Sequence, residues 1–279
     1  MHYATAQKDS ELLDYVNTTS TKMAWGGIFD HVGGGFSRYS VDTKWHVPHF
    51  EKMLYDNAQL VSLYSQAYQA SKSELYKEIV EETLEWVARE MTGPDDEFYS
   101  ALDADSEGEE GKFYVWQKSA LQSIVPENEW EAFSKYYDLD KGKWEHENII
   151  LMRSDESQST KVKECNTLLL KERSKRVRPG LDDKCLTSWN ALMIVGYLDA
   201  YLALGNKSYL DVAIRNANFI LDEQAKSDGS LLHSYKAGES KINGLLEDYA
   251  FTIQPSSEEP NLEELIEEID AWENSKKKK

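Results

Sequence analysis

Cysteine is scarce in this sequence. The chain has 279 residues and two cysteines, Cys165 and Cys185, which lie far apart and form no C-x-x-C pair. This spacing excludes a disulfide scaffold, a zinc ribbon and a thioredoxin motif within the chain. Two free thiols are typical of a reducing compartment, so we expect a cytoplasmic protein.

Positive charge and long apolar runs are also lacking. Lysine and arginine number 31 against 50 acidic residues, and the formal net charge is −19. An excess of negative charge repels phosphate backbones, which argues against a nucleic-acid partner. No apolar run approaches the ~20 residues that span a bilayer, and Met1–Thr5 does not begin a secretory signal. We therefore expect no membrane association.

Helical patterns dominate what is present. Residues 50–91 contain no glycine or proline, and apolar side chains recur there at the three-and-four spacing of one helix face. The polar stretch Ala70–Ser73 interrupts this face, and Gly93-Pro94 ends the second segment. The pattern predicts two antiparallel helices joined by a short turn.

This hairpin recurs along the chain. A shift of 133 positions places Asn57-Ala58 on Asn190-Ala191 and continues without a gap to Asp95 on Asp228. Shifts of 63 and 192 place Glu11-Leu12 on Glu74-Leu75 and Asp56 on Asp248. Two amphipathic helices can share some alanines and tyrosines by chance, but an ungapped match through helix, turn and exit loop favours a true repeat. The fold class that follows is all-α.

The segments between the hairpins are polar. Residues 98–116 read as a small β excursion with a strand at Phe113–Trp116, and residues 119–137 read as helical with a break at Pro126. Residues 154–163 read as a polar loop. We assign residues 1–254 to the domain of repeated helical hairpins and residues 255–279 to an acidic tail that ends in four lysines.

Three polar motifs resemble known sites only in part. The glycines of Gly26–Tyr39 lack the Gly-Lys-Ser/Thr and Rossmann patterns, so they indicate a sharp backbone bend and no nucleotide cofactor. His46, His49 and Glu51 could bind a metal, but Pro48 keeps them off a regular helix, and capping is the stronger interpretation. Asp103–Glu110 opens like a calcium loop, yet Tyr114 replaces the twelfth-position glutamate. We predict no metal and no cofactor.

The repeat predicts where the acidic residues meet. Equivalent helices of a ring begin at the same end, so the groups that precede them should converge on one opening. Each carboxylate taken singly could merely favour the positive end of a helix. Carboxylates beside flat aromatic faces also suit sugar chemistry, since acids transfer protons and aromatics stack on C–H faces. The converging groups are His49, Glu51 and Asp56; Asp182, Asp183 and Lys184; and Glu247 and Asp248, with Trp45, Trp116 and Trp189 nearby in sequence.

Five stretches resemble the spermatogenesis-associated protein 20 family: Gly26–Tyr39, Trp45–Asn57, Ala101–Trp116, Asp182–Met193 and Glu247–Phe251. The resemblance covers residues 1–254 and implies an (α/α)6 toroid like that of six-hairpin glycosidases and N-acylglucosamine 2-epimerases. It also implies a thioredoxin-like domain ahead of the toroid and further C-terminal hairpins; we expect neither in this chain, where the 255–279 tail takes the place of those hairpins. On this resemblance the chain is truncated. Sugar isomerases of the related fold use histidine bases, so His31, His46 and His49 become candidates by analogy.

These observations favour a carbohydrate-active toroid, either isomerase/epimerase-like or glycosidase-like. The alternative is a non-enzymatic scaffold that binds a protein partner or itself through uncovered helix faces. A third possibility, redox work, belongs to the thioredoxin-like domain that the resemblance implies, and titration of the Cys165 and Cys185 thiols would test it. The candidate catalytic residues are His46, His49, Glu51, Asp103, Asp183 and Asp248. The candidate substrate-binding residues are His31, Arg38, Trp45, Asp56, Trp116, Lys184, Trp189, Asn190 and Tyr249.

Overall fold

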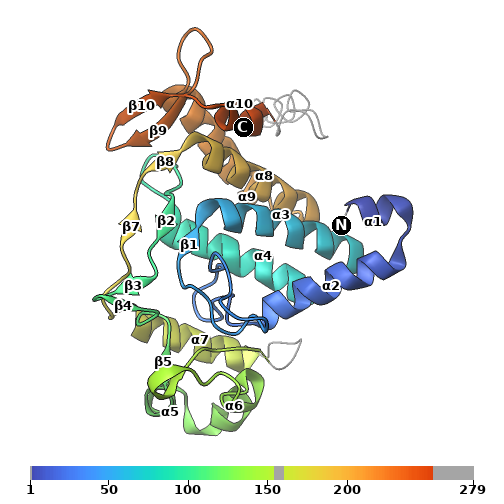
Figure 1. Ribbon diagram of the computed structural model, residues 1–279, viewed down its shortest axis with the longest axis vertical. Helices are drawn as coiled ribbons and strands as arrows, with labels where there is room; N and C mark the ends of the chain where they lie inside the picture. The colour runs from blue at the N-terminus through green and yellow to red at the C-terminus, as the bar shows by residue number, and fades with distance from the viewer. Residues whose placement is uncertain (1, 154–159, 254–279) are drawn as a thin grey trace, which may run out of the picture.

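Two helical hairpins form the centre of the computed structural model, which describes residues 2–153 and 160–253 (Figure 1). Helices α3 (Leu54–Ser71) and α4 (Glu74–Trp86) make the first hairpin, and α8 (Thr187–Leu204) and α9 (Lys207–Phe219) make the second. Helices α3 and α8 pack side by side along their length. The tail expected at 255–279 and residues 154–159 of the expected loop lie outside the described residues. Residues 160–163, which were also expected in that loop, form the first turn of α7 (Thr160–Arg173), so the helix begins earlier than predicted.

The two hairpins are equivalent residue by residue, which confirms the predicted shift of 133. Every helix boundary of the second hairpin lies 133 positions after its counterpart in the first. Lys72 and Gly205 both end the inner helix in the left-handed conformation. A short π-helix ends each outer helix, η1 (Val87–Met91) in one and η4 (Ile220–Gln224) in the other.

Further helices flank this pair. Helix α1 (His2–Gln7) leads into α2 (Ser10–Trp25), whose first turn is capped by Asp9 through a 3.0 Å bond from the Leu12 N–H. Helix α10 (Leu246–Ile253) packs on α8 at the other side. The chain is therefore all-α in its architecture, as predicted.

Short strands gather at one end of the hairpins, around the starts of α3 and α8 (Figure 1). One sheet has the order β1-β2-β7, and a second has the order β10-β9-β8. All pairings in them are antiparallel. The strands are β1 (Lys52–Met53), β2 (Ala101–Leu102), β7 (Leu181–Asp182), β8 (Cys185–Leu186), β9 (Leu232–Lys236) and β10 (Glu239–Asn243).

The β excursion differs in detail from the prediction. The acidic loop is a hairpin of β3 (Asp105–Ser106) and β4 (Glu109–Glu110), closed by a turn in which Glu107 and Gly108 both have positive φ. The strand expected at 113–116 begins only at Trp116, in β5 (Trp116–Gln117), and pairs with β6 (Asn148–Ile149). The reason is a turn at 111–114, where the N–H of Tyr114 donates to the carbonyl of Gly111.

A smaller group of helices, which we call the smaller body, lies below the hairpins in Figure 1. The helical stretch predicted at 119–137 is interrupted at Pro126 as expected, and its helices enclose a second apolar core around Leu121, Phe133 and Leu169. The body comprises α5 (Lys118–Ile124), η2 (Glu127–Glu129), α6 (Trp130–Tyr137), η3 (Glu145–Glu147) and α7 (Thr160–Arg173).

No helix among residues 2–153 and 160–253 is long and apolar enough to cross a membrane.

Candidate functional site

The starts of α3, α8 and α10 meet at one end of the molecule, which we call the rim. The rings of Tyr55 on α3 and Trp189 on α8 lie 4.7 Å apart, centroid to centroid. The N–H of Ser188 donates to Asp248 Oδ1 on α10 at 3.0 Å. Direct contacts therefore join the first turns of the three helices, as the repeat requires.

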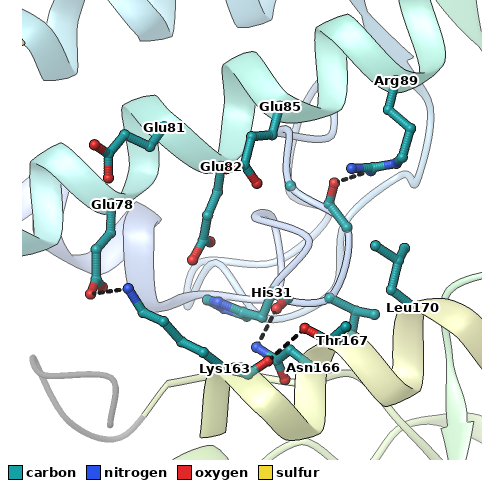
Figure 2. Close-up of a pocket in the computed structure, with 13 residues that line it drawn as sticks. His31, Glu78, Glu81, Glu82, Glu85, Arg89, Lys163, Asn166, Thr167 and Leu170 are labelled. Carbon is teal, nitrogen blue, oxygen red and sulfur yellow. Dashed lines mark hydrogen bonds and ion pairs between the residues drawn. The ribbon is translucent and has the colours of Figure 1, made fainter. Parts of the chain in front are cut away.

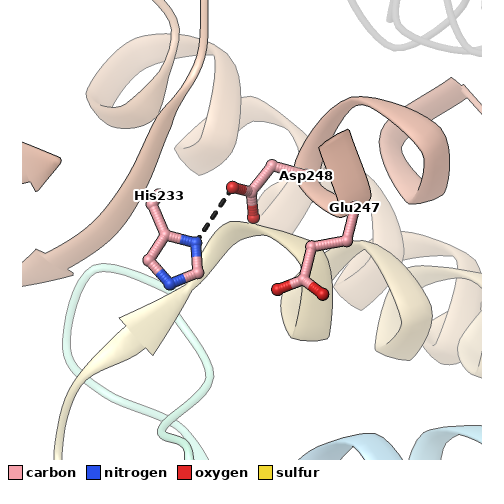
Figure 3. Close-up of side chains that lie close together, drawn as sticks. All are labelled: His233, Glu247 and Asp248. Atoms are coloured by element: carbon pink, nitrogen blue, oxygen red, sulfur yellow. Dashed lines mark hydrogen bonds and ion pairs between the residues drawn. The ribbon is translucent and has the colours of Figure 1, made fainter. Parts of the chain in front are cut away.

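His233 and Asp248 form a hydrogen-bonded pair at the rim (Figure 3). Asp248 is fully buried, and its Oδ2 lies 2.9 Å from His233 Nδ1. A carboxylate only accepts hydrogen bonds, so Nδ1 carries the proton and, in a neutral ring, Nε2 keeps a free lone pair. The His233 side chain is 17% exposed. This is the arrangement of an oriented general base.

Asp248 is held rigidly by the backbone around it. Besides His233, its carboxylate accepts the N–H of Ser188 and, at 2.7 Å, the N–H of Leu245. These donors lie at the starts of α8 and α10, where the helix dipole favours a negative charge. Glu247 completes a group that could hold a metal ion, since one ligand atom from each of the three side chains lies within 4.8 Å of the others.

Asp56, in the first turn of α3, is the second unusual group at the rim. It is half-buried, and its Oδ2 has no hydrogen-bond partner among the described residues. Burial raises the pKa of this carboxyl to about 6, although a hydrogen bond from Tyr55 and the charge of Arg38 act in the opposite direction. A carboxyl with this pKa can donate a proton near neutral pH.

Predicted residues from the first set form a chain beside Asp56. Arg38 Nη1 lies 2.8 Å from Glu51 Oε2, and His49 Nε2 lies 3.8 Å from the same oxygen. His49 Nδ1 is 3.0 Å from Glu110 Oε1, and the imidazole stacks on Tyr39 at 4.8 Å. His49 and Glu51 are thus brought together, while Glu110 enters from the β3–β4 hairpin.

The second predicted set also lies at the rim. Asp183 pairs with Lys236 on β9, and this hydrogen bond lowers the pKa of Asp183. Lys184 Nζ lies 2.7 Å from both oxygens of Asp182. Since Lys236 and His233 both lie on β9, this strand connects Asp183, the partner of Lys236, to Asp248, the partner of His233. Asp103 is exposed, and its Oδ1 accepts the N–H of Ala104.

Three predicted substrate-binding residues are used by the fold. Asn190 is fully buried: its Oδ1 accepts the N–H of Phe98 at 2.8 Å and its Nδ2 donates to the Phe98 carbonyl. Asn57, its repeat equivalent, binds the N–H and carbonyl of Phe36 in the same way. Tyr249 occupies the third equivalent position, where its hydroxyl accepts the N–H of Leu231 at 3.0 Å. Trp116, the last of these three predicted residues, is 1% exposed in the smaller core, and its ring lies under the Arg176 guanidinium. Assigning Asn190 and Trp116 to ligand contact was wrong, because both are buried.

The other candidates lie in the loop and cavity before residue 60. The carbonyl of Trp45 accepts the N–H of Ile28 at 3.2 Å, and the N–H of His46 donates to Asp42 Oδ1 at 3.2 Å. His31 is 4% exposed and lines a cavity against α4 and α7. Burial lowers the pKa of its imidazole to about 3. His31 therefore stands apart from the histidine and carboxylates of the rim.

His233 was missed in the sequence, although the repeat contained a signal for it. The shift of 133 places His233 on Ser100, which lies at the rim beside the start of α3, where its carbonyl accepts the N–H of Leu54. The 232–236 segment has no apolar/polar alternation of its own; it forms β9 by pairing with β8 just before α8 begins.

Comparison with known proteins shows relatives over most of the chain. The human protein spermatogenesis-associated protein 20 is 35% identical over 283 aligned residues, which cover 85% of this chain. An uncharacterized protein of Caenorhabditis elegans is 30% identical over 89% of this chain. The chain spans 36% and 40% of the lengths of these two relatives. No family model matches the chain.

Solved structures share the fold at low sequence identity. A family 76 glycoside hydrolase from a Bacteroides thetaiotaomicron strain is 13% identical, with a TM-score of 0.51 over 95% of this chain and 43% of its own. A UGL variant with dGlcA-Glc-Rha-Glc is 14% identical, with a TM-score of 0.50 over 93% of this chain and 53% of its own. The likeness confirms the predicted architecture, part of an (α/α)6 toroid of the glycosidase type.

Proposed function

Over 85% of its length this chain belongs to the spermatogenesis-associated protein 20 family, and from that premise we propose that its rim transfers protons on a carbohydrate, in a reaction of the isomerase or epimerase class. The observation that carries the proposal is the His233–Asp248 pair, an oriented imidazole at the joined starts of α8 and α10. The glycosidase-type toroid gives independent support, since two structures with this fold are a glycoside hydrolase and a complex with a sugar chain.

In the proposed reaction, His233 Nε2 removes the proton from the carbon next to a sugar carbonyl. The imidazolium that forms is stabilised by the buried Asp248 carboxylate at 2.9 Å. Asp56, with its pKa near 6, supplies a proton to the sugar oxygen on which negative charge develops. The His233 imidazolium then gives a proton to the carbon while one enediol hydroxyl returns its proton to the Asp56 carboxylate, so the isomerisation or epimerisation is completed and both groups are regenerated with no other reactant.

Aromatic side chains at the rim suit the sugar itself. Trp189 is partly exposed and lies against Tyr55, so the two rings offer apolar faces beside polar groups. Asp183 and Lys184 lie between β7 and β8, and Lys236 ends β9; these three residues offer charged partners for ring hydroxyls. Asn190 and Trp116 have no part in this proposal.

Solvent isotope exchange tests the reaction without knowledge of the product. The protein is incubated in D2O with a panel of reducing aldoses, ketoses and disaccharides, and proton NMR follows loss of the signal of the C–H next to the carbonyl, which is at C2 in an aldose and at C1 or C3 in a 2-ketose. We expect exchange with at least one sugar, and we expect His233→Gln to lower its rate by at least a hundredfold. The matched control is His146→Gln, a change at an exposed histidine of η3 that should leave the rate unaltered.

Two outcomes would contradict the proposal. Absence of exchange with every sugar of the panel would reject the enzyme function. Exchange that survives in His233→Gln would keep the enzyme function and reject His233 as the base.

A further inference from the structure

A separate cavity of about 220 Å³ lies away from the rim, between α4, α7 and the glycine loop at 31–34 (Figure 2). Its wall on α4 is made by four glutamates, and α7 contributes Lys163 and Asn166. The glutamates are spaced as i, i+3, i+4 and i+7, so they share one helix face. They are Glu78, Glu81, Glu82 and Glu85.

Negative charge on this wall exceeds the positive charge that faces it. Glu78 pairs with Lys163 Nζ and with Arg153 Nη1, each at 3.1 Å. Arg153 Nη2 also lies 3.6 Å from Glu82. In the described part of the chain no ion pair involves Glu81 or Glu85. The remaining cation of the wall, Arg89, is paired with Glu90 at 2.8 Å. Among the described residues, two of the four carboxylates therefore lie beyond ion-pair distance of any cation, although Lys77 and Lys163 act on Glu81, and Arg89 acts on Glu85, from further away.

The carboxylates show the electrostatic cost of this arrangement. Burial raises the pKa of Glu82 to about 7, with a further contribution from the charge of Glu78 and despite the charge of Arg153. Burial also raises the pKa of Glu81. A bound cation would favour the ionised form of both groups.

His31 provides an independent sign of a missing hydrogen-bond donor. It lines the cavity, and Figure 2 shows its ring between the Glu82 carboxylate and α7. Its Nε2 lies 3.2 Å from the carbonyl of Trp25 and 3.0 Å from that of Gly26, so Nε2 carries the proton. The buried ring is neutral, and Nδ1 is then an acceptor that has no partner among the described residues. Carboxylates together with a free imidazole lone pair call for a ligand rich in N–H donors.

The spread of the acceptors separates an organic cation from a metal ion. A divalent metal needs several ligand atoms within a few ångströms of one another. Among the described residues only His233, Glu247 and Asp248 are so placed, and they lie at the rim. The glutamates extend instead over two turns of α4. We propose that this cavity binds a linear organic dication, a diamine or polyamine, whose ammonium groups lie along the glutamate face while one donates to His31 Nδ1.

Isothermal titration calorimetry with 1,4-diaminobutane and spermidine tests the proposal, with butylamine and magnesium chloride as comparison ligands. We expect the diamine or spermidine to bind at least tenfold more tightly than butylamine. Glu82→Gln and Glu81→Gln should each weaken this binding at least fivefold. The matched control, Glu131→Gln on an exposed position of α6, removes the same charge and should change it less than twofold.

Proton linkage gives a second readout of the same experiment. Binding at pH 7 should release protons from Glu82, seen as a heat that depends on the ionisation enthalpy of the buffer, and affinity should rise between pH 6 and 8. Arg153, Lys163, His31 and the other three glutamates face Glu82; the His31 ring is already neutral in this range, and the neighbouring Glu82 carboxylate raises the pKa of Arg153 despite its burial. Equal loss of binding in Glu131→Gln, or magnesium binding as tight as the diamine, would overturn the proposal. Absence of diamine binding would also overturn it, whatever the sugar experiment shows.

Discussion

At the scale of single residues, Asp56 couples the rim to stability. Its pKa is raised to about 6, so the native state holds a proton more tightly than the unfolded chain. The free energy of unfolding should therefore fall as pH rises from about 4 to 6, and Asp56 should be a net cost at pH 7. A shift of two units corresponds to about 3 kcal/mol for a buried group, which partial exposure reduces to about 1 kcal/mol.

We expect Asp56→Asn to unfold at a higher urea concentration than the original protein at pH 7, and to lose this advantage at pH 4. Urea unfolding at the two pH values measures the effect. Asp211→Asn, at an exposed position of α9, is the control and should show no such pH dependence. A destabilised Asp56→Asn at pH 7 would mean that the carboxylate makes a favourable interaction there.

The same scale shows where sequence reasoning reached its limit. Asp248 was predicted at the rim, because its position follows from the repeat. Its partner His233 was not. The repeat places His233 on Ser100 at the rim, but its contact with Asp248 forms only through the pairing of β9 with β8, which are distant in sequence. Asn190 was assigned to a ligand because an asparagine that binds backbone looks the same in a sequence as one that binds a sugar.

At the scale of elements, one polar side chain fixes each inner helix to the preceding exit loop. Asn57, Asn190 and Tyr249 do this in three successive repeats. Loss of the amide would leave a buried N–H and a buried carbonyl without partners. We expect Asn57→Ala and Asn190→Ala each to cost about 2–3 kcal/mol in urea unfolding. Asn190→Ala should cost more, because Asn190 Oδ1 also accepts from Asn216 at 2.9 Å.

Two further variants make this prediction specific. Tyr249→Phe removes one acceptor, so it should cost about 1 kcal/mol. Asn128→Ala, at an exposed side chain, should change stability by less than about 0.5 kcal/mol. Similar small losses in all four variants would show that water replaces the amide bonds and that the clamps contribute little.

Helices and strands differed in how far the sequence predicted them. The hairpins could be predicted to within a few residues because an ungapped repeat carries helix, turn and exit together, down to the left-handed Lys72 and Gly205. Two-residue strands such as β5 and β7 have no periodicity of their own. They exist because neighbouring segments supply the hydrogen bonds, so their pairing could not be inferred from composition.

At the scale of the whole molecule, a buried ion cluster joins the two cores. Asp30 lies in the glycine loop, Lys52 in β1 at the start of the first hairpin, and Arg173 at the end of α7 in the smaller body. Lys52 Nζ is 2.8 Å from Asp30 Oδ2, and both Nη atoms of Arg173 reach the same carboxylate, at 2.8 and 2.9 Å. Burial would raise the pKa of Asp30, but Arg173 and Lys52 outweigh it and hold that pKa well below its usual value.

The Asp30 carboxylate neutralises Lys52 at the start of the first hairpin and Arg173 in the smaller body. Its removal should therefore destabilise both parts of the molecule. Asp30→Asn would leave Lys52 and Arg173 buried without a counter-charge, at a cost of about 3–5 kcal/mol. We expect amide hydrogen exchange to accelerate in α3 and in α7 together. Lys52→Met keeps the Asp30–Arg173 pair, so this variant should fold and lose less stability than Asp30→Asn.

The pH dependence has a fixed sign. The folded pKa of Asp30 is depressed, so the contribution of Asp30 to stability is present above the unfolded value of about 4 and is lost only as pH falls below it.

Amide hydrogen exchange that accelerates in α7 alone, with α3 unchanged, would show that the smaller body opens independently and that the cluster does not couple the two cores.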